Sequence, residues 1–259
     1  MNEPFLIPVS GALTEVFFSD IHFPYHLSPV WTVAKKILRR IKPDLVWLGG
    51  DIGDPQSLSR HPKKHIETTL LKEEIAGIRV GLNEVRRAAS SSRIVFQEGN
   101  HDAWVARYLQ DKAPELEELE ELRLPQLFHL DRLGIEHVPE YTRAKVGKLM
   151  HIHGHEVQGG GDNPAKNKFK RLRCNFICGH HHKFAEYGER DADGEYREGY
   201  ANACMVPLEH DWAFSTDWHW GFRVVRYARG GFFHMEKVHV HMEGGVYFGV
   251  WDGRIYEGV

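Results

Sequence analysis

Short apolar runs that end in polar, glycine-bearing clusters recur through the first hundred residues of the chain. Three of these runs lie at 16–18, 45–48 and 94–96. Each one predicts a buried strand followed by a loop, because a short apolar segment bounded by turn residues is typical of a strand covered on both faces. Helix-length stretches over 30–40 and about 65–89 separate the runs. The pattern therefore predicts a β-α-β-α-β order with adjacent, mostly parallel strands.

The second half of the chain has a different pattern. A helical section follows His101 to about residue 130, and short strands are expected at 149–152, 175–178, 183–187 and 195–200. Alternating residues broken by glycine pairs predict an antiparallel β-meander at about 221–259. We find no linker or repeat, so we expect a single domain over 1–259, with a helical insertion at about 103–130.

Composition narrows the class of protein. Of the 259 residues, 42% are hydrophobic and 27% are charged, which is typical of a soluble globular chain. The net charge of -3 gives no general attraction to nucleic acid or to an anionic membrane. Three cysteines without a repeated spacing argue against a disulfide framework. With no long apolar run, we expect a cytoplasmic protein with no membrane partner.

Histidine is the unusual residue, with 18 copies, and it is the commonest metal ligand in proteins. Asp20 and His22 follow the first predicted strand two residues apart, so in an extended segment both could face one metal. Asp51 follows two glycines after the second strand, where its two oxygens could bridge a pair of cations about 3.5–4 Å apart. Each motif alone is also common turn chemistry.

Three further polar clusters follow later strands. The tetrad Gly99 to Asp102 lines up an amide, an imidazole and a carboxylate, and histidines alternate at 151, 153 and 155 and again at 180 and 182. Strand alternation would send His180 and His182 one way and His181 the other. Ligands of open α/β sheets bind at the carboxyl ends of strands, so the five clusters together favour one shared metal site.

The order of these motifs resembles the calcineurin-like metallophosphoesterase superfamily. The matching segments read D-x-H at 20–22, G-D-x-x-D at 50–54, G-N-H-D at 99–102, H-G at 153–154 and G-H-x-H at 179–182. The resemblance implies an α/β fold, a two-sheet β-sandwich flanked by helices, with a dinuclear metal centre at the sheet edge. By position, the first metal would be held by Asp20, His22 and His182, the second by Asn100, His153 and His180, and Asp51 would bridge them.

The same resemblance implies roles for the residues beside the ligands. His101 would stay unligated next to the leaving-group oxygen, and Asp102 would orient it. His153 is preferred as ligand because it directly precedes a glycine, and His151 and His155 stay open as alternatives. Pro55 and Gln56 replace the Arg-Gly of the protein Ser/Thr phosphatase branch, so protein phosphatase activity is not expected. The layout looks more like small bacterial or phage-encoded phosphoesterases.

These features predict a metal-dependent hydrolase of phosphate esters with two divalent ions. Mixed nitrogen and oxygen ligands suit Mn, Fe, Zn or Ni, and of these we expect Mn. We expect a phosphodiesterase that acts on DNA, RNA or nucleotides. The alternatives are a phosphomonoesterase on small or protein substrates and a non-catalytic scaffold of the same fold. Near the metals, substrate could be bound by Asp54, Arg60, Lys63 and Lys64, since a cation can hold a non-reacting phosphate oxygen.

Two other segments admit two interpretations each. The basic stretch 166–173 could follow a nucleic-acid backbone, or it could be the solvated face of a helix. Trp212, Trp218 and Trp220 could stack a base, or they could pack in the core. The sequence leaves the oligomeric state open.

Overall fold

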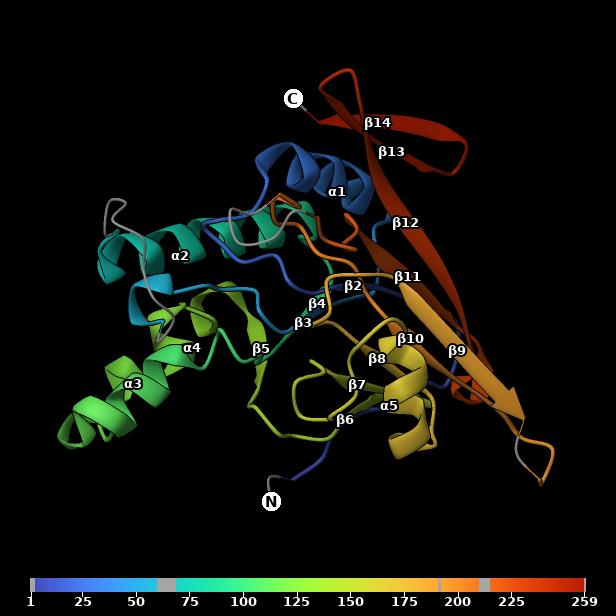
Figure 1. The fold of residues 1–259 in the computed structure, drawn as a ribbon, viewed down its shortest axis with the longest axis horizontal. Helices are drawn as coiled ribbons and strands as arrows, with labels where there is room; N and C mark the ends of the chain where they lie inside the picture. Colours follow the sequence, from blue (N-terminus) through green and yellow to red (C-terminus); the bar gives the residue numbers. More distant parts are fainter. Residues whose placement is uncertain (1–2, 60–68, 191, 210–214, 259) are drawn as a thin grey trace.

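Two β-sheets pack face to face in the computed structural model, which describes residues 3–59, 69–190, 192–209 and 215–258 (Figure 1). The larger sheet has the strand order β14-β13-β12-β11-β2-β3-β4-β5. Its strands are β2 Leu13–Phe18, β3 Leu45–Gly49, β4 Arg93–Gln97, β5 Ile135–Val138, β11 Gly221–Tyr227, β12 Phe233–Glu243, β13 Val246–Trp251 and β14 Arg254–Gly258. The smaller sheet has the order β1-β6-β7-β8-β10-β9. Its strands are β1 Phe5–Ile7, β6 Ala144–Val146, β7 Leu149–Ile152, β8 Phe176–Cys178, β9 Ala185–Arg190 and β10 Tyr196–Ala201.

The predicted β-α-β-α-β order of the first half is confirmed. Strands β2, β3 and β4 are parallel neighbours, and helices α1 (Ser28–Ile41) and α2 (Leu71–Ala88) connect them. Helix α1 has a proline in its first turn, where a missing amide hydrogen costs nothing. It ends at Ile41, and the capping residue that follows, Lys42, has a left-handed backbone conformation. Parallel strands with such crossovers put their carboxyl ends, and the loops that follow, on one edge of the sheet.

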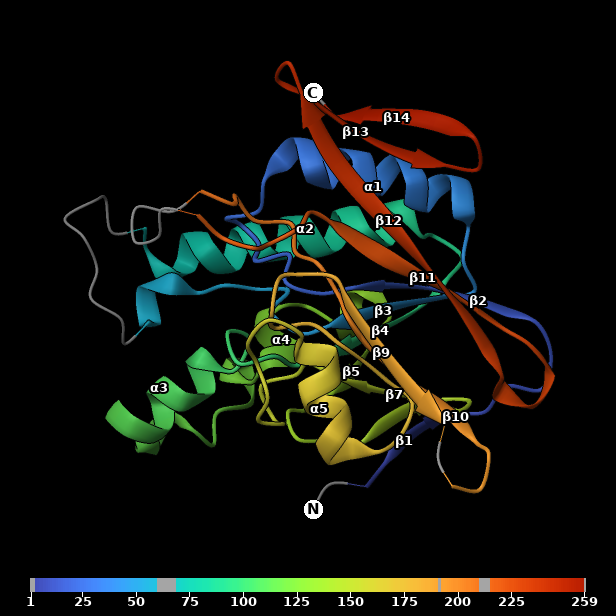
Figure 2. The same ribbon diagram turned by 45° about the vertical axis from the view of Figure 1, so that its right-hand side comes forward.

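Three apolar clusters define the layers. One cluster joins α1 and α2 to the outer face of the larger sheet, with Val33, Ile78 and Phe18 among its members. A second lies between the two sheets, and a third joins the smaller sheet to helix α5 (Pro164–Leu172). Figure 2 shows the same arrangement from another side, with α1 and α2 on one flank and α5 on the other. The two-sheet sandwich flanked by helices is therefore confirmed.

The C-terminal strands form an antiparallel series that extends the larger sheet. Strand β11 pairs with β2 and β12, β12 pairs with β13, and β13 pairs with β14, all antiparallel. Trp220 packs against the core of the helix side, in agreement with the core interpretation for that residue. Trp212 lies outside the described residues.

Two segments depart from their expected form. The helical section after His101 is broken into α3 (Trp104–Lys112), two 3-10 turns and α4 (Leu124–Leu127). Pro114 begins the first of these turns, and Pro125 lies in the first turn of α4. In α5, Lys168 is buried and its Nζ donates hydrogen bonds to the carbonyls of Gly154 and Val157. The basic stretch is therefore not a uniformly solvated face. In the part of the chain that the structure describes, no helix is both long and apolar enough to cross a membrane.

Candidate metal centre

The loops after β2, β3, β7 and β8 bring metal-ligating side chains together at one edge of the sandwich. One group consists of Asp20, His22 and His182, and a second consists of Asp51, His153 and His180. Within each group, one potential ligand atom of every residue lies within 4.8 Å of the others. Carboxylate oxygens and imidazole nitrogens at this spacing are the donors that borderline divalent ions prefer.

Backbone conformation explains how short loops present so many ligands. Asp20, His22, Asp51, His180 and His182 all have φ between 52° and 70°, in the left-handed region. Such residues are uncommon outside glycine and concentrate at functional sites. His180 and His182 follow the end of β8 and do not belong to a strand, so alternation along a strand is not what places them. They serve different groups, His182 beside Asp20 and His180 beside Asp51.

Two glycines are required by the close approach of these loops. A Cβ at Gly99 would lie 2.3 Å from the Asp51 carboxylate, and one at Gly179 would lie 2.5 Å from the Asp20 carboxylate. Both distances are far below van der Waals contact, and both neighbours are buried. The G-N-H-D and G-H-x-H motifs therefore need their glycines for space beside a carboxylate.

Hydrogen bonds fix which imidazole nitrogen faces the centre. The Nδ1 of His153 donates to the carbonyl of Gly49 at 2.9 Å, and the Nδ1 of His22 donates to Asp54 at 3.0 Å. Once the ring is neutral, each of these bonds leaves the lone pair on Nε2, and a hydrogen bond of this kind is the usual support for a metal-ligating histidine. Among the described residues, His22 Nε2 and Asn100 Oδ1 are buried without a hydrogen-bond partner. Buried acceptors left in this way fit a site that takes cations.

The electrostatics of the two groups also fit cations. Burial would raise the pKa of the Asp51 carboxyl, but His153 and His101 hold it well below its usual range. Burial opposes protonation of His22, yet the hydrogen bond to Asp54 raises its pKa to about 9. Similarly, Asp51 raises the pKa of His153 to about 10 against the effect of burial. Without metal, protons on these histidines balance the buried carboxylates, so binding of a metal has to displace protons.

His101 lies beside both groups without belonging to the ligand sets that the motifs imply. Its Nδ1 is 2.9 Å from Asp54 Oδ1, and its Nε2 is 3.9 Å from Asp51 Oδ2. The imidazole stacks on Trp104, with ring centroids 4.2 Å apart and planes 28° apart. The side chain is 26% exposed, so Nε2 can meet a substrate while Nδ1 stays fixed.

The expected role of Asp102 does not match this geometry. Both of its oxygens accept backbone amides, from Gly53 at 2.8 Å, Gly99 at 2.8 Å and Ile52 at 3.4 Å. Burial and the Asp51 charge raise the pKa of Asp102 to about 8, while the amide donors favour its ionised form. Asp102 therefore ties the Asp51 loop to the tetrad loop, and Asp54 is the carboxylate that orients His101.

Asp54 is also misplaced as a substrate-binding residue. It is 2% exposed, and its oxygens are taken by His22, His101 and the Gln56 amide. A carboxylate with this many donors has nothing left to offer a substrate, and a like-charged phosphate would be repelled. The other residues expected to bind substrate, Arg60, Lys63 and Lys64, lie outside the described residues.

The three neighbouring histidines at 151, 153 and 155 have different partners. His151 lies between the sheets, with Nε2 2.8 Å from Glu15. His155 lies outside the groups, with Nε2 2.5 Å from Glu140. Only His153 of the three has its Nε2 beside Asp51, at 3.1 Å. The geometry therefore favours His153 over both alternatives.

Several supporting residues gave no signal in the sequence. Arg107 donates to the carbonyl of Asn100 at 2.9 Å and pairs with Glu140, which also contacts His155. Glu156 accepts the backbone amides of His153 at 3.1 Å and of Gly154 at 2.6 Å. Arg107 and Glu140 are far apart in the chain and belong to no motif, so only the fold brings them together.

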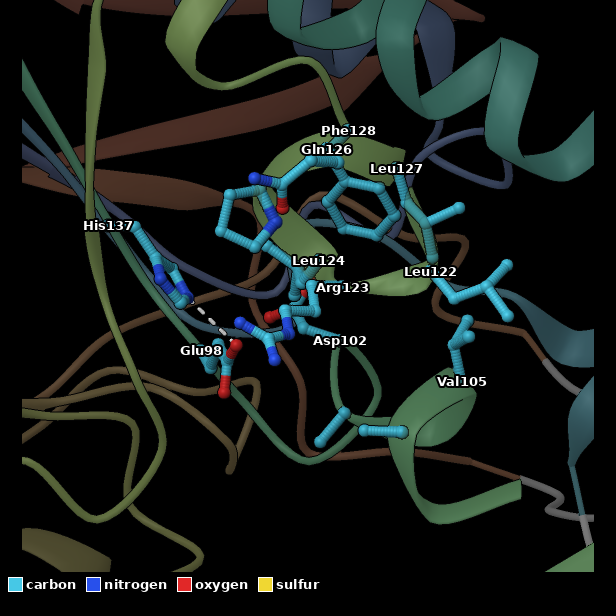
Figure 3. A pocket seen from close by; sticks show the side chains of 13 residues that line it. Glu98, Asp102, Val105, Leu122, Arg123, Leu124, Gln126, Leu127, Phe128 and His137 are labelled. Atoms are coloured by element: carbon cyan, nitrogen blue, oxygen red, sulfur yellow. Dashed lines mark hydrogen bonds and ion pairs between the residues drawn. The ribbon is translucent and has the colours of Figure 1, made fainter. Parts of the chain in front are cut away.

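A cavity of about 430 Å³ lies behind the tetrad loop and is distinct from the metal centre (Figure 3). Asp102, Glu98 and His137 contribute its polar wall, and the α4 segment, including Phe128, contributes its apolar wall. Its lining includes none of the seven residues expected to hold metals. The cavity thus reaches Asp102 but none of the proposed ligands.

Comparison with solved structures finds similar chains at low sequence identity. Vps29 from Cryptosporidium parvum is 14% identical, with 96% of this chain and 97% of that chain covered and a TM-score of 0.48. Vps29 of Entamoeba histolytica, complexed with Zn²⁺, is 12% identical, with 95% and 97% covered and a TM-score of 0.45. A dimetal phosphatase from Danio rerio is 13% identical, with 88% and 99% covered and a TM-score of 0.42. No curated protein matches the chain.

The family model for calcineurin-like phosphoesterases matches residues 15–220. That span begins in β2, ends just before β11 and contains every one of the seven proposed ligands. The resemblance inferred from the motifs is thereby confirmed, and the chain belongs to the calcineurin-like phosphoesterase family.

Proposed function

We propose that the protein hydrolyses phosphate esters with two divalent metal ions, with a preference for phosphodiesters. The observation that carries this proposal is the pair of adjacent ligand groups with His101 beside them, held through Nδ1 by a buried carboxylate. In the proposed arrangement, Asp20, His22 and His182 hold one ion, Asn100, His153 and His180 hold the other, and Asp51 bridges them. When bound, the two ions would supply Lewis acidity toward the phosphoryl oxygens and activate the attacking water.

His101 is the proposed general acid. Its hydrogen bond to Asp54 fixes the ring through Nδ1, so Nε2 is the nitrogen that can give a proton to a departing oxygen. When an alkyl diester is hydrolysed, the leaving group is a strongly basic alkoxide. Such a leaving group benefits more from a positioned acid than a weakly basic one does. A positioned acid thus favours substrates with alkoxide leaving groups, and alkyl diesters are the members of that class that we propose.

The alternative function from a different class is a non-catalytic scaffold of the same fold. A scaffold is free to lose ligand atoms or the acid, whereas this chain keeps all seven proposed ligands, His101, and the Asp54 that holds it. Retention of the complete set supports an enzyme.

Hydrolysis of bis-p-nitrophenyl phosphate and of p-nitrophenyl phosphate tests the proposal. Both substrates release the same chromophore, so their kcat/KM values compare a diester with a monoester directly. We expect turnover with Mn²⁺, none after chelation, and the higher kcat/KM for the diester. Higher kcat/KM for the monoester would favour the phosphomonoesterase alternative. No turnover of either substrate with Mn²⁺, Zn²⁺, Ni²⁺ or Fe²⁺ would favour the scaffold.

A further inference from the structure

Five aromatic and imidazole rings form a continuous row on the surface near the metal centre. This ring row consists of Phe184, His219, His239, His241 and Phe248. Centroids are 4.5 Å apart for Phe184 and His239, 5.7 Å for His239 and His241, and 5.6 Å for His241 and Phe248. The rings come from four separate segments of the chain, so only the fold assembles the row.

The ring row occupies a sheet face that is covered elsewhere. On β12, Phe233 and Met235 pack into the core between the sheets, whereas His239 and His241, further along the same face, are half-buried and exposed. Figures 1 and 2 show β12 continuing beyond the smaller sheet, alongside α1. The opposite face of this part of β12 is covered, because Val238 belongs to the core on the helix side. In the part of the chain that the structure describes, His219 and His241 are exposed, so the row extends an interior face toward the surface.

One end of the ring row meets the metal centre. Phe184 follows the proposed ligand His182 by two residues, and the amide of His219 donates to the carbonyl of His182 at 2.8 Å. The indole of Trp218 lies 4.1 Å from the His182 ring, in an edge arrangement. At the other end, Phe248 lies on β13 and is paired across the strands with Glu257 of β14. The row thus has a direction, from the centre outward along the sheet.

The chemistry of the ring row suits flat, uncharged groups. Burial and the neighbouring Lys237 lower the pKa of His239 to about 4, so this imidazole is neutral near pH 7. Rings in a row can stack nucleobases, and stacking tolerates any base because every base has a π-face. Lys237 is exposed on the same face, and its 3.5 Å pair with Glu186 is at the surface, where such pairs are weak. It could therefore turn toward a phosphate.

We propose that the ring row is a stacking track for single-stranded nucleic acid, which it guides to the metal centre. The proposal rests on the proposed function, because it names the substrate class of that same site. The exposed lysines and arginines of α5 are the competing surface for such a ligand. They lie on the other side of the smaller sheet from the larger one, and one of the helix's lysines, Lys168, is buried. We favour the ring row over the α5 surface because a residue of the row, His219, is hydrogen-bonded to the proposed ligand His182.

Fluorescence anisotropy with labelled oligo(dT), in the presence of a chelator to prevent cleavage, tests the track. The double variant His241→Ala/Phe248→Ala removes one exposed and one half-buried ring, and we expect binding to weaken at least about tenfold, since stacking contributes about 1–3 kcal/mol per base. The matched control is His234→Ala, an exposed histidine on the opposite face of β12, which should bind as the native chain does. Duplex DNA of the same length should bind more weakly than the single strand.

Turnover of bis-p-nitrophenyl phosphate, measured on the same variants, separates this proposal from the proposed function. We expect both variants to keep native turnover of that small diester, which also shows that they are folded. Native affinity for oligo(dT) in His241→Ala/Phe248→Ala would overturn the track. So would equal loss in His234→Ala, loss only in Lys166→Ala/Lys170→Ala, or no binding by the native chain. A native dimer that the double variant converts to monomer in size-exclusion chromatography would assign the face to a second copy and would also overturn it.

Discussion

His151 lies in β7 and His153 directly follows that strand, and yet the two histidines belong to two different kinds of buried polar cluster. His151 is fully buried between the sheets. There Glu15 accepts hydrogen bonds from His151 and from the Tyr227 hydroxyl, both at 2.8 Å. His153 is at the edge, among Asp51, His180 and the other proposed ligands. The Glu15 cluster is arranged around one carboxylate, whereas the edge cluster holds several carboxylates together with the imidazoles of the two ligand groups.

The difference shows that burial and residue type alone do not identify a metal site. In the Glu15 cluster, the carboxylate has a donor for each oxygen, and one nitrogen, His151 Nδ1, lacks a partner among the described residues. At the edge, His22 Nε2 and Asn100 Oδ1 lack partners and Asp20 and Asp51 lie close by. The site that fits cations is distinguished because several potential ligand atoms without hydrogen-bond partners lie close to buried carboxylates.

Removal of the proposed bridge should have the largest effect. We expect Asp51→Ala to lower kcat/KM for bis-p-nitrophenyl phosphate by at least about 10³-fold, because metal ions contribute several kcal/mol of transition-state stabilisation. Steady-state kinetics with saturating Mn²⁺ measure the loss. The matched control is Glu15→Gln in the interior cluster, which should keep kcat/KM within about threefold, as surplus stability at 25 °C keeps the chain folded. Comparable loss in both variants would remove the distinction between the clusters.

His101→Ala separates chemistry from metal binding. We expect kcat for a diester with an alkoxide leaving group to fall about 10²–10⁴-fold, which is the usual contribution of a positioned general acid, while metal content stays native. The imidazole contacts Asp54 and Trp104 but is not a proposed ligand, so its loss should leave both metals bound. Loss of metal in this variant would place His101 among the ligands.

Metal affinity should depend on pH at the edge cluster. The pKa values of His22 and His153 are raised to about 9 and about 10 in the metal-free chain, so both hold protons at neutral pH. A metal must displace these protons, and affinity should therefore fall at least about tenfold per unit as the pH is lowered from about 8 to about 6. Calorimetric titration of Mn²⁺ in buffers of different ionisation enthalpy measures the released protons. Equal affinity at both pH values would contradict the proposed ligand role of these histidines.

The interior cluster should matter for stability. We expect Glu15→Gln to lower the free energy of unfolding by about 1–3 kcal/mol, because the amide can satisfy only one of the donors from His151 and Tyr227. Urea denaturation of the metal-free protein measures this change. An unchanged midpoint would show that the cluster contributes nothing to the fold.

Tyr227→Phe is the smallest test of the same cluster. It removes one hydrogen bond to Glu15 without changing the packing of the ring, so we expect a loss of about 0.5–1.5 kcal/mol. The same urea titration compares it with Glu15→Gln. A loss larger than that of Glu15→Gln would mean that the tyrosine hydroxyl, and not the carboxylate, organises the cluster.

Sequence patterns predicted much of this molecule because its ligands follow strands whose apolar runs are unmistakable. They predicted β2, β3 and β4 with their crossover helices, and they predicted that polar loops meet at one edge. Periodicity could not assign the oxygens of Asp54 and Asp102, since which carboxylate meets His101 depends on how two loops cross. Nor could it find Arg107 with Glu140, or the ring row, since these are assembled from distant segments.

Metal content after gel filtration tests the central claim most directly. Elemental analysis of the native chain, Asp51→Ala and Glu15→Gln, each loaded with Mn²⁺, counts ions bound per chain. The account predicts about two ions in the native chain and in Glu15→Gln, and at most about one in Asp51→Ala, which lacks the proposed bridge. Two ions retained in Asp51→Ala, or ions lost from Glu15→Gln, would contradict it.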